Sequence, residues 1–113
     1  MTRRSMESLF LRALFIGSAI IVLVFSLMPT QMLPGVALDL WDKAQHLLVF
    51  LYLTILGCMA YRSPFRLLLA LIIFGGLIEI LQRLSGWRFG DWLDLLADVL
   101  GVLLGLAIYR AYR

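Results

Sequence analysis

Residues 91–105, DWLDLLADVLGVLLG, place carboxylates and small residues at helical spacing within an apolar sequence. The stretch holds three aspartates, Asp91, Asp94 and Asp98. They recur at i, i+3 and i+7, so they share one face of a helix. Ala97, Gly101 and Gly105 recur every four residues, a spacing that lets membrane helices approach closely. Because an ionised group facing lipid costs about 2.5–3.5 kcal/mol on insertion scales, the stretch predicts a membrane helix whose polar and small residues face other helices.

The rest of the chain repeats this apolar character. Of its 113 residues, 63% are hydrophobic and 15% charged, whereas about a quarter of a soluble domain is charged. Apolar runs fall at about 9–28, 44–61, 67–82 and 92–109, each near the roughly 17–25 residues that cross a bilayer as a helix. Proline or glycine interrupts the chain between the runs. These features predict an all-α polytopic membrane protein, a four-transmembrane-helix antiparallel bundle with short loops, forming a single domain over residues 1–113.

The basic residues predict the orientation of the bundle. With four spans, both termini and the loop at 61–66 share one side of the membrane. That side carries Arg3, Arg4, Arg12, Arg62, Arg66, Arg110 and Arg113, and the other carries Lys43, Arg83 and Arg88. The positive-inside rule then places both termini in the cytoplasm of a bacterial cytoplasmic (inner) membrane. The first apolar run is long for a signal peptide and lacks a small-x-small cleavage site after Met28, so we expect an uncleaved first span.

Polar residues gather on the side opposite the termini. They fall near the predicted helix ends, and the cost of exposing charge to lipid should turn them toward one another. Asp42, His46 and Phe50 lie at i, i+4 and i+8 on one face of the second span. The predicted cluster consists of Asp42, Lys43, His46, Glu79, Gln82, Arg83, Arg88, Asp91, Asp94 and Asp98.

Several of these residues also have a purely structural interpretation. The sequence DKAQ at 42–45 resembles a capping box, and DWLD at 91–94 could cap the fourth span. The spacing favours a capping role for Asp42, Asp91 and Asp94. His46 could form a structural pair with Asp42, and Arg83 and Arg88 could neutralise acids or contact headgroups. The deepest carboxyls, on Glu79 and Asp98, are the hardest to explain without a function.

Three segments resemble the VanZ-like family of small bacterial membrane proteins. They are DKAQHLLVF at 42–50, EILQ at 79–82 and RFGDWLDLLADVLGVLLG at 88–105. The chain departs from the family pattern at Asp98, where the family usually has asparagine. The family is named for a protein linked to teicoplanin resistance, so the resemblance implies a role outside the cytoplasmic membrane and leaves the activity open.

We expect the polar cluster to bind an anionic envelope lipid, such as a polyprenyl-phosphate carrier or a phospholipid. The expected ligand-binding residues are Lys43, Gln82, Arg83, Arg88, Asp91, Asp94 and Asp98. An alternative is a membrane-embedded hydrolase or transferase with His46, Glu79 and Asp42 as catalytic residues. A divalent metal held by His46, Glu79, Asp94 and Asp98, and a structural ion network that serves a partner protein, are further alternatives. The sequence predicts no cofactor and no nucleic-acid binding.

Overall fold

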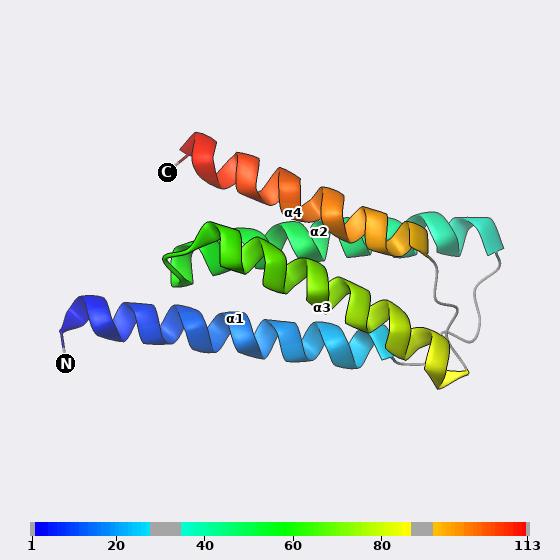
Figure 1. Cartoon of the computed structure of the whole chain (residues 1–113), viewed down its shortest axis with the longest axis horizontal. Helices are drawn as coiled ribbons and strands as arrows, with labels where there is room; N and C mark the ends of the chain where they lie inside the picture. The colour runs from blue at the N-terminus through cyan, green and yellow to red at the C-terminus, as the bar shows by residue number, and fades with distance from the viewer. Residues whose placement is uncertain (1, 28–34, 87–91, 113) are drawn as a thin grey trace.

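The computed structural model describes residues 2–27, 35–86 and 92–112, with the backbone alone described for residues 35–42. It contains four helices, α1 (Arg3–Leu27), α2 (Gly35–Ala60), α3 (Pro64–Ser85) and α4 (Trp92–Tyr112) (Figure 1). All four are long and apolar enough to cross a membrane. The molecule extends 50 Å along its longest axis, which covers the roughly 40–45 Å of a bilayer with its headgroups. The predicted all-α four-helix membrane bundle is confirmed.

The ends of the helices correct one interpretation of the sequence. Helix α3 begins as expected, with Pro64 in its first turn and the Ser63 hydroxyl accepting a hydrogen bond from the Arg66 amide at 3.4 Å. Helix α2, however, begins at Gly35, so Asp42 lies well inside it. The predicted capping role of Asp42 at the start of this helix is therefore wrong. An N-cap serves the unbonded amides of the first turn, and those amides lie before Asp42 because the helix continues beyond its apolar part.

Helices that follow one another in the chain run antiparallel, whereas α2 and α4 run parallel and pack tightly together (Figure 1). Gly101 lies against the carbonyl oxygen of Leu47, and one turn further a Cβ on Gly105 would lie 2.7 Å from the carbonyl oxygen of Leu51. Backbones this close leave no room for a side chain. The small residues of α4 therefore set its register against α2, as the spacing in the sequence predicted.

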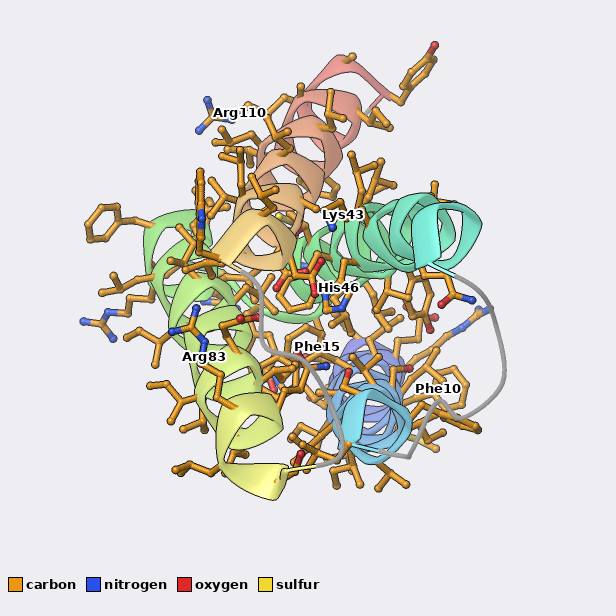
Figure 2. All side chains as sticks on the ribbon, turned by 90° about the vertical axis from the view of Figure 1, so that its right-hand side faces the viewer. Phe10, Phe15, Lys43, His46, Arg83 and Arg110 are labelled. Carbon is orange, nitrogen blue, oxygen red and sulfur yellow. The ribbon has the colours of Figure 1, made fainter. Side chains whose placement is uncertain are left out.

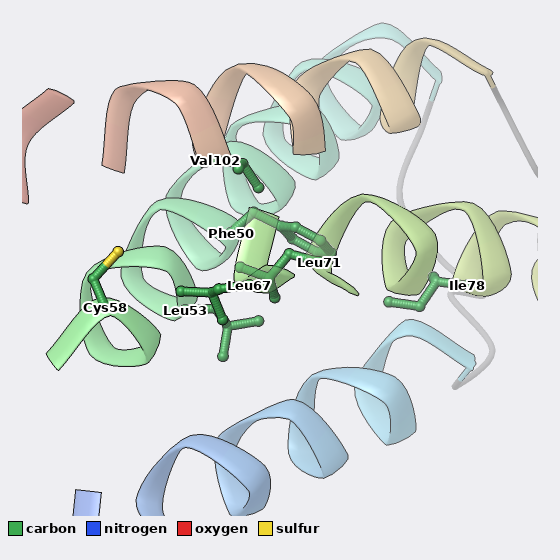
Figure 3. Close-up of a cluster of buried hydrophobic side chains, with 7 residues drawn as sticks. All are labelled: Phe50, Leu53, Cys58, Leu67, Leu71, Ile78 and Val102. Atoms are coloured by element: carbon green, nitrogen blue, oxygen red, sulfur yellow. The ribbon is translucent and has the colours of Figure 1, made fainter. Parts of the chain in front are cut away.

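The backbones of α1 and α4 do not come close to each other within the described residues, because α2 and α3 lie between them (Figure 2). The middle of the bundle is a cluster of buried apolar side chains contributed by α2, α3 and α4 (Figure 3). At its centre the ring of Phe50 stacks on that of Phe74, with 6.0 Å between the ring centroids. Cys58 also belongs to this cluster, as a buried thiol. The apolar cluster separates two chemically different ends of the molecule.

We call these ends the basic end and the polar end. At the basic end, the start of α1, the connection between α2 and α3 and the last turn of α4 lie together (Figure 1). Its described cations are Arg3, Arg4, Arg12, Arg62, Arg66 and Arg110. The described charged and amide side chains of the polar end are Lys43, His46, Glu79, Gln82, Arg83, Asp94 and Asp98.

Candidate functional site

The deepest contact of the polar end joins His46 of α2 to Asp98 of α4. The Nδ1 atom of His46 lies 2.8 Å from Oδ1 of Asp98, and both side chains are buried. Helix α3 closes the third side, since a Cβ at Gly75 would lie only 2.8 Å from Oδ2 of Asp98. The absence of a side chain at Gly75 makes the space that this carboxylate occupies. A buried histidine is thus held in one orientation by a carboxylate from another helix.

The sequence did not indicate this pairing. The i, i+4 spacing pointed to Asp42 as a partner of His46, and the structure adds Asp98, whose Oδ1 lies next to Nδ1 of His46. Because α2 and α4 lie parallel and close, Asp98 comes level with His46 although 52 positions separate them in the chain. The side chain of Asp42 lies outside the described residues. His46 and Phe50 do share the inward face, as predicted, and both are buried.

A second pair joins the same two helices about one turn nearer the end of the bundle. The Nζ atom of Lys43 lies 3.6 Å from Oδ1 of Asp94, and the lysine side chain is 27% exposed against 4% for the aspartate. Asp94 stands in the first turn of α4, where the helix dipole favours a negative charge. Its position fits the predicted role at the start of the helix, and the structure adds a cross-helix ion pair to that role.

Helix α3 contributes a third acid and base. Glu79 and Arg83 are one turn apart, with Oε1 of the carboxylate 3.4 Å from Nε of the guanidinium. The arginine side chain is 56% exposed and the glutamate 9%. Since Glu79 stands one turn beyond Gly75, which contacts Asp98, its carboxyl belongs to the same end of the interior. Figure 2 shows Lys43 and His46 between α2 and α4, with Arg83 beside α3.

Gln82 links this cluster to α1. Its side-chain amide donates a hydrogen bond from Nε2 to the carbonyl oxygen of Ser26 at 2.9 Å, and the residue is fully buried. Ser26 lies in the last turn of α1, where carbonyl groups have no partner within the helix. The Oε1 atom of Gln82 is also buried and has no hydrogen-bond partner among the described residues. Gln82 therefore fastens the end of α1 and brings a further acceptor into the interior.

The charges of the polar end are arranged in layers. The three buried carboxylates belong to Glu79, Asp94 and Asp98. Lys43 and Arg83, which pair with two of them, are the more exposed partner in each case. The cationic groups thus form a rim, and the acids lie beneath it. This layering was not evident from the sequence, in which acids and bases alternate.

The structure brings seven of the ten predicted site residues to one end of the bundle: Lys43, His46, Glu79, Gln82, Arg83, Asp94 and Asp98. Arg88 and Asp91 lie outside the described residues, as does the side chain of Asp42. In the part of the chain that is described, no group of three or more His, Cys, Asp or Glu side chains is placed to hold a metal ion. Sequence reasoning missed the Ser26 carbonyl, because no pattern in the chain marks which backbone atoms face the site.

The chain can be compared with known protein families. The family model described as VanZ/LLP1 matches residues 5–113, which includes all four helices except the first two residues of α1. No curated protein and no solved structure matches the chain. The match confirms the family that the segments at 42–50, 79–82 and 88–105 resemble, and it extends the similarity to the first helix. The chain is therefore a member of the VanZ/LLP1 family, a multi-pass membrane protein whose described buried charged and amide side chains gather at one end of a four-helix bundle.

Proposed function

We propose that the polar end binds the anionic headgroup of an envelope lipid, either a phospholipid or a polyprenyl-phosphate-linked precursor of the cell wall. The observation that carries this proposal is the layering of charge. The side chains of Lys43 and Arg83 are 27% and 56% exposed, whereas their acidic partners are 4% and 9% exposed. A headgroup phosphate that approaches from the membrane surface meets the cations first.

The position of Arg83 lets it reach a phosphate at the surface. The Arg83–Glu79 pair is a single i, i+4 contact at 3.4 Å, and the arginine side chain is 56% exposed. A guanidinium binds phosphate through two parallel hydrogen bonds, which are stronger and more specific than a single surface contact. Arg83 is accordingly the residue best suited to grip the phosphate, with Lys43 as a second positive charge.

The layer below the rim suits the uncharged polar part of a headgroup. Carboxylates and the carboxamide oxygen of Gln82 accept hydrogen bonds from hydroxyl groups such as those of glycerol or a sugar. The Oε1 atom of Gln82 is buried and has no hydrogen-bond partner among the described residues. A buried acceptor of this kind gains stability when a ligand donates to it. The proposed ligand is therefore an anionic lipid whose headgroup carries hydroxyl groups.

We further propose that the polar end faces the outside of a bacterial cytoplasmic membrane. Support comes from the charge distribution, since the described arginines at positions 3, 4, 12, 62, 66 and 110 gather at the opposite end. Glycopeptides such as teicoplanin act outside that membrane, so this orientation fits a role in such resistance. Cysteine labelling in intact cells tests it: a cysteine at Ser85 should react with an impermeant maleimide, and a cysteine at Ser63 should not.

Native mass spectrometry of the purified protein tests lipid binding. We expect a phosphatidylglycerol or a polyprenyl phosphate to bind at least tenfold more tightly than phosphatidylcholine, because only the former carry a net negative charge. The double variant Lys43→Ala and Arg83→Ala should lose this preference at the polar end. Arg66→Ala is the matched control, since it removes an exposed arginine from the opposite end.

Two results would count against the proposal. One is that the double variant, with its fold intact by circular dichroism, binds as many anionic lipid molecules as the unaltered protein. The other is an equal loss in the Arg66→Ala control, which would point to general surface charge. Turnover of a bound lipid that depends on His46 would instead favour the enzymatic alternative, because a histidine oriented by a carboxylate can act as a general base.

A further inference from the structure

The basic end contains a cavity that has no part in the polar site. Its volume is about 770 Å³, and it lies between the first turns of α1, the connection from α2 to α3 and Tyr109 of α4. Three arginines line it, Arg4, Arg12 and Arg62. On α2, Phe50 and Leu53 of the apolar cluster lie between His46 and Cys58, the first residue of that helix to line the cavity.

Arg12 is held in a fixed position at this cavity. Its Nε atom donates a hydrogen bond to the carbonyl oxygen of Ala60 at 3.2 Å, and the guanidinium carbon lies 5.1 Å from the ring centroid of Tyr61. The ring of Tyr61 is itself packed edge-on against Phe15, with 5.5 Å between the centroids. A guanidinium anchored through Nε and stacked on an aromatic ring loses little conformational freedom when it binds an anion.

The net charge of the lining is positive. Among the described residues that line the cavity, Glu7 is the one acid, and its carboxylate pairs with Arg3 at 3.4 Å. Arg4, Arg12 and Arg62 thus outweigh Glu7 even before the charge of Arg3 is counted. Hydroxyl groups of Thr2, Ser5 and Ser8 add hydrogen-bonding capacity. This combination of arginine and hydroxyl groups is suited to a phosphate.

The same cavity has an apolar edge. Leu9 and Met59 line it, and they are 58% and 54% exposed on the outside of the bundle. In a membrane these side chains face acyl chains, so a phosphate in the cavity could remain attached to its lipid. A soluble phosphate compound would gain nothing from this apolar edge.

We propose that this cavity binds the phosphate of an anionic membrane lipid, in the leaflet opposite to the one reached by the polar end. Arg12 supplies the fixed guanidinium, Arg4 and Arg62 close around the phosphate, and Leu9 and Met59 receive the first part of an acyl chain. Basic pockets between membrane helices are a known type of site for anionic headgroups. The molecule then carries two lipid sites, one at each end.

The decisive experiment compares arginines at the same end of the molecule. Binding of phosphatidylglycerol to the full-length protein is measured by native mass spectrometry for Arg62→Ala and for Arg66→Ala. Both residues are exposed and four positions apart, but only Arg62 lines the cavity. We expect Arg62→Ala to weaken binding of one lipid molecule about tenfold, because a hydrogen-bonded charge is lost, and Arg66→Ala to leave it unchanged.

A second set of variants separates binding from folding. Arg12→Ala removes a contact that also serves the end of α2, so it can destabilise the protein, whereas Arg4→Ala removes only an exposed side chain. We expect Arg4→Ala to weaken binding as well, with the circular dichroism spectrum unchanged. Equal losses in Arg62→Ala and Arg66→Ala, or equal binding of phosphatidylglycerol and phosphatidylcholine, would overturn the proposal.

Two further measurements identify the source of the phosphate and distinguish the two proposed lipid sites. Glycerol 3-phosphate at millimolar concentration should not displace the lipid, and full displacement would mean that the cavity takes a soluble anion. The double variant Lys43→Ala and Arg83→Ala should keep the lipid bound at the basic end. If that variant loses all bound lipid while Arg62→Ala loses none, the site at the basic end does not exist and the polar-end proposal stands.

Discussion

The interface between α2 and α4 and the packing of α1 against the rest of the bundle are held by different means. Helices α2 and α4 meet backbone to backbone at Gly101 and share two polar side-chain pairs, the buried His46–Asp98 contact and the partly exposed Lys43–Asp94 ion pair. Helix α1 buries none of its residues fully. Three described hydrogen bonds attach it to the other helices, one near its start, one near its middle and one at its end. They are Arg12 to Ala60, Ser18 to Tyr52, and Gln82 to Ser26.

The difference shows how helices associate where water is absent. Lipid tails are as apolar as leucine, so close packing and hydrogen bonds must hold the helices together. The α2–α4 pair uses both over most of its length, and it positions the polar site. Helix α1 contributes only partly buried apolar side chains, such as Phe15 and Leu23, and a few polar contacts, so we expect it to open before the other three helices do. The following substitutions test whether the α2–α4 interface is more stable than the packing of α1, from the largest expected effect to the smallest.

Replacement of Asp98 should have the largest effect. Asp98→Ala leaves His46 buried without its carboxylate, and loss of one member of a buried pair costs about 3–5 kcal/mol. Unfolding in mixed micelles of sodium dodecyl sulfate should show this loss in free energy. Asp98→Asn is the matched control, because its amide oxygen can still accept a hydrogen bond from Nδ1 of His46. If both variants were equally destabilised, the charge and not the hydrogen bond would be the essential feature.

Gly101→Ala should have the second-largest effect. The added Cβ would overlap the carbonyl oxygen of Leu47, and the two backbones must separate to admit it. Overpacking of this kind costs about 1–3 kcal/mol. The control is Gly76→Ala, since nothing lies within 4 Å of a Cβ at that position. That variant should be neutral or more stable by up to about 1 kcal/mol because alanine favours the helix.

Gln82→Ala should weaken α1 in preference to the other helices. It removes the hydrogen bond to the Ser26 carbonyl, which is worth about 1 kcal/mol, and leaves a small cavity. Hydrogen exchange followed by mass spectrometry should show faster exchange in the second half of α1, with α2 and α4 unchanged. Equal acceleration in all four helices would mean that α1 is not an independently opening element.

Ser18→Ala should have the smallest effect. The hydroxyl oxygens of Ser18 and Tyr52 are 3.0 Å apart. The Tyr52 residue is 45% exposed and Ser18 is half-buried. We expect a loss of less than about 0.5 kcal/mol in the same unfolding assay. A loss above 1 kcal/mol would show that α1 depends on this contact more than its exposure indicates.

Much of the site followed from local periodicity. The i, i+3 and i+4 spacings predicted that His46 and Phe50 share the inward face, and that Gly101 and Gly105 form a packing surface. These predictions were confirmed, because a helix fixes which of its own residues point the same way. The capping role of Asp42 was wrong, because the start of α2 is not where its apolar run begins. Periodicity describes one helix at a time and carries no information about its neighbours.

The sequence by itself determined the number of helices and their membrane character. It also determined the inward direction of five polar side chains, those of His46, Glu79, Gln82, Asp94 and Asp98, whereas Arg83 is 56% exposed. These properties depend on hydrophobicity and helical geometry, which are local. Only the tertiary structure decided that Asp98 pairs with His46, that Gln82 holds the end of α1, and that Arg4, Arg12 and Arg62 surround one cavity. Each of these arrangements brings together residues from separate parts of the chain. The His46–Asp98 contact forms because Gly101 and Gly105 let α2 and α4 approach in parallel, which brings the two side chains to the same level of the bundle.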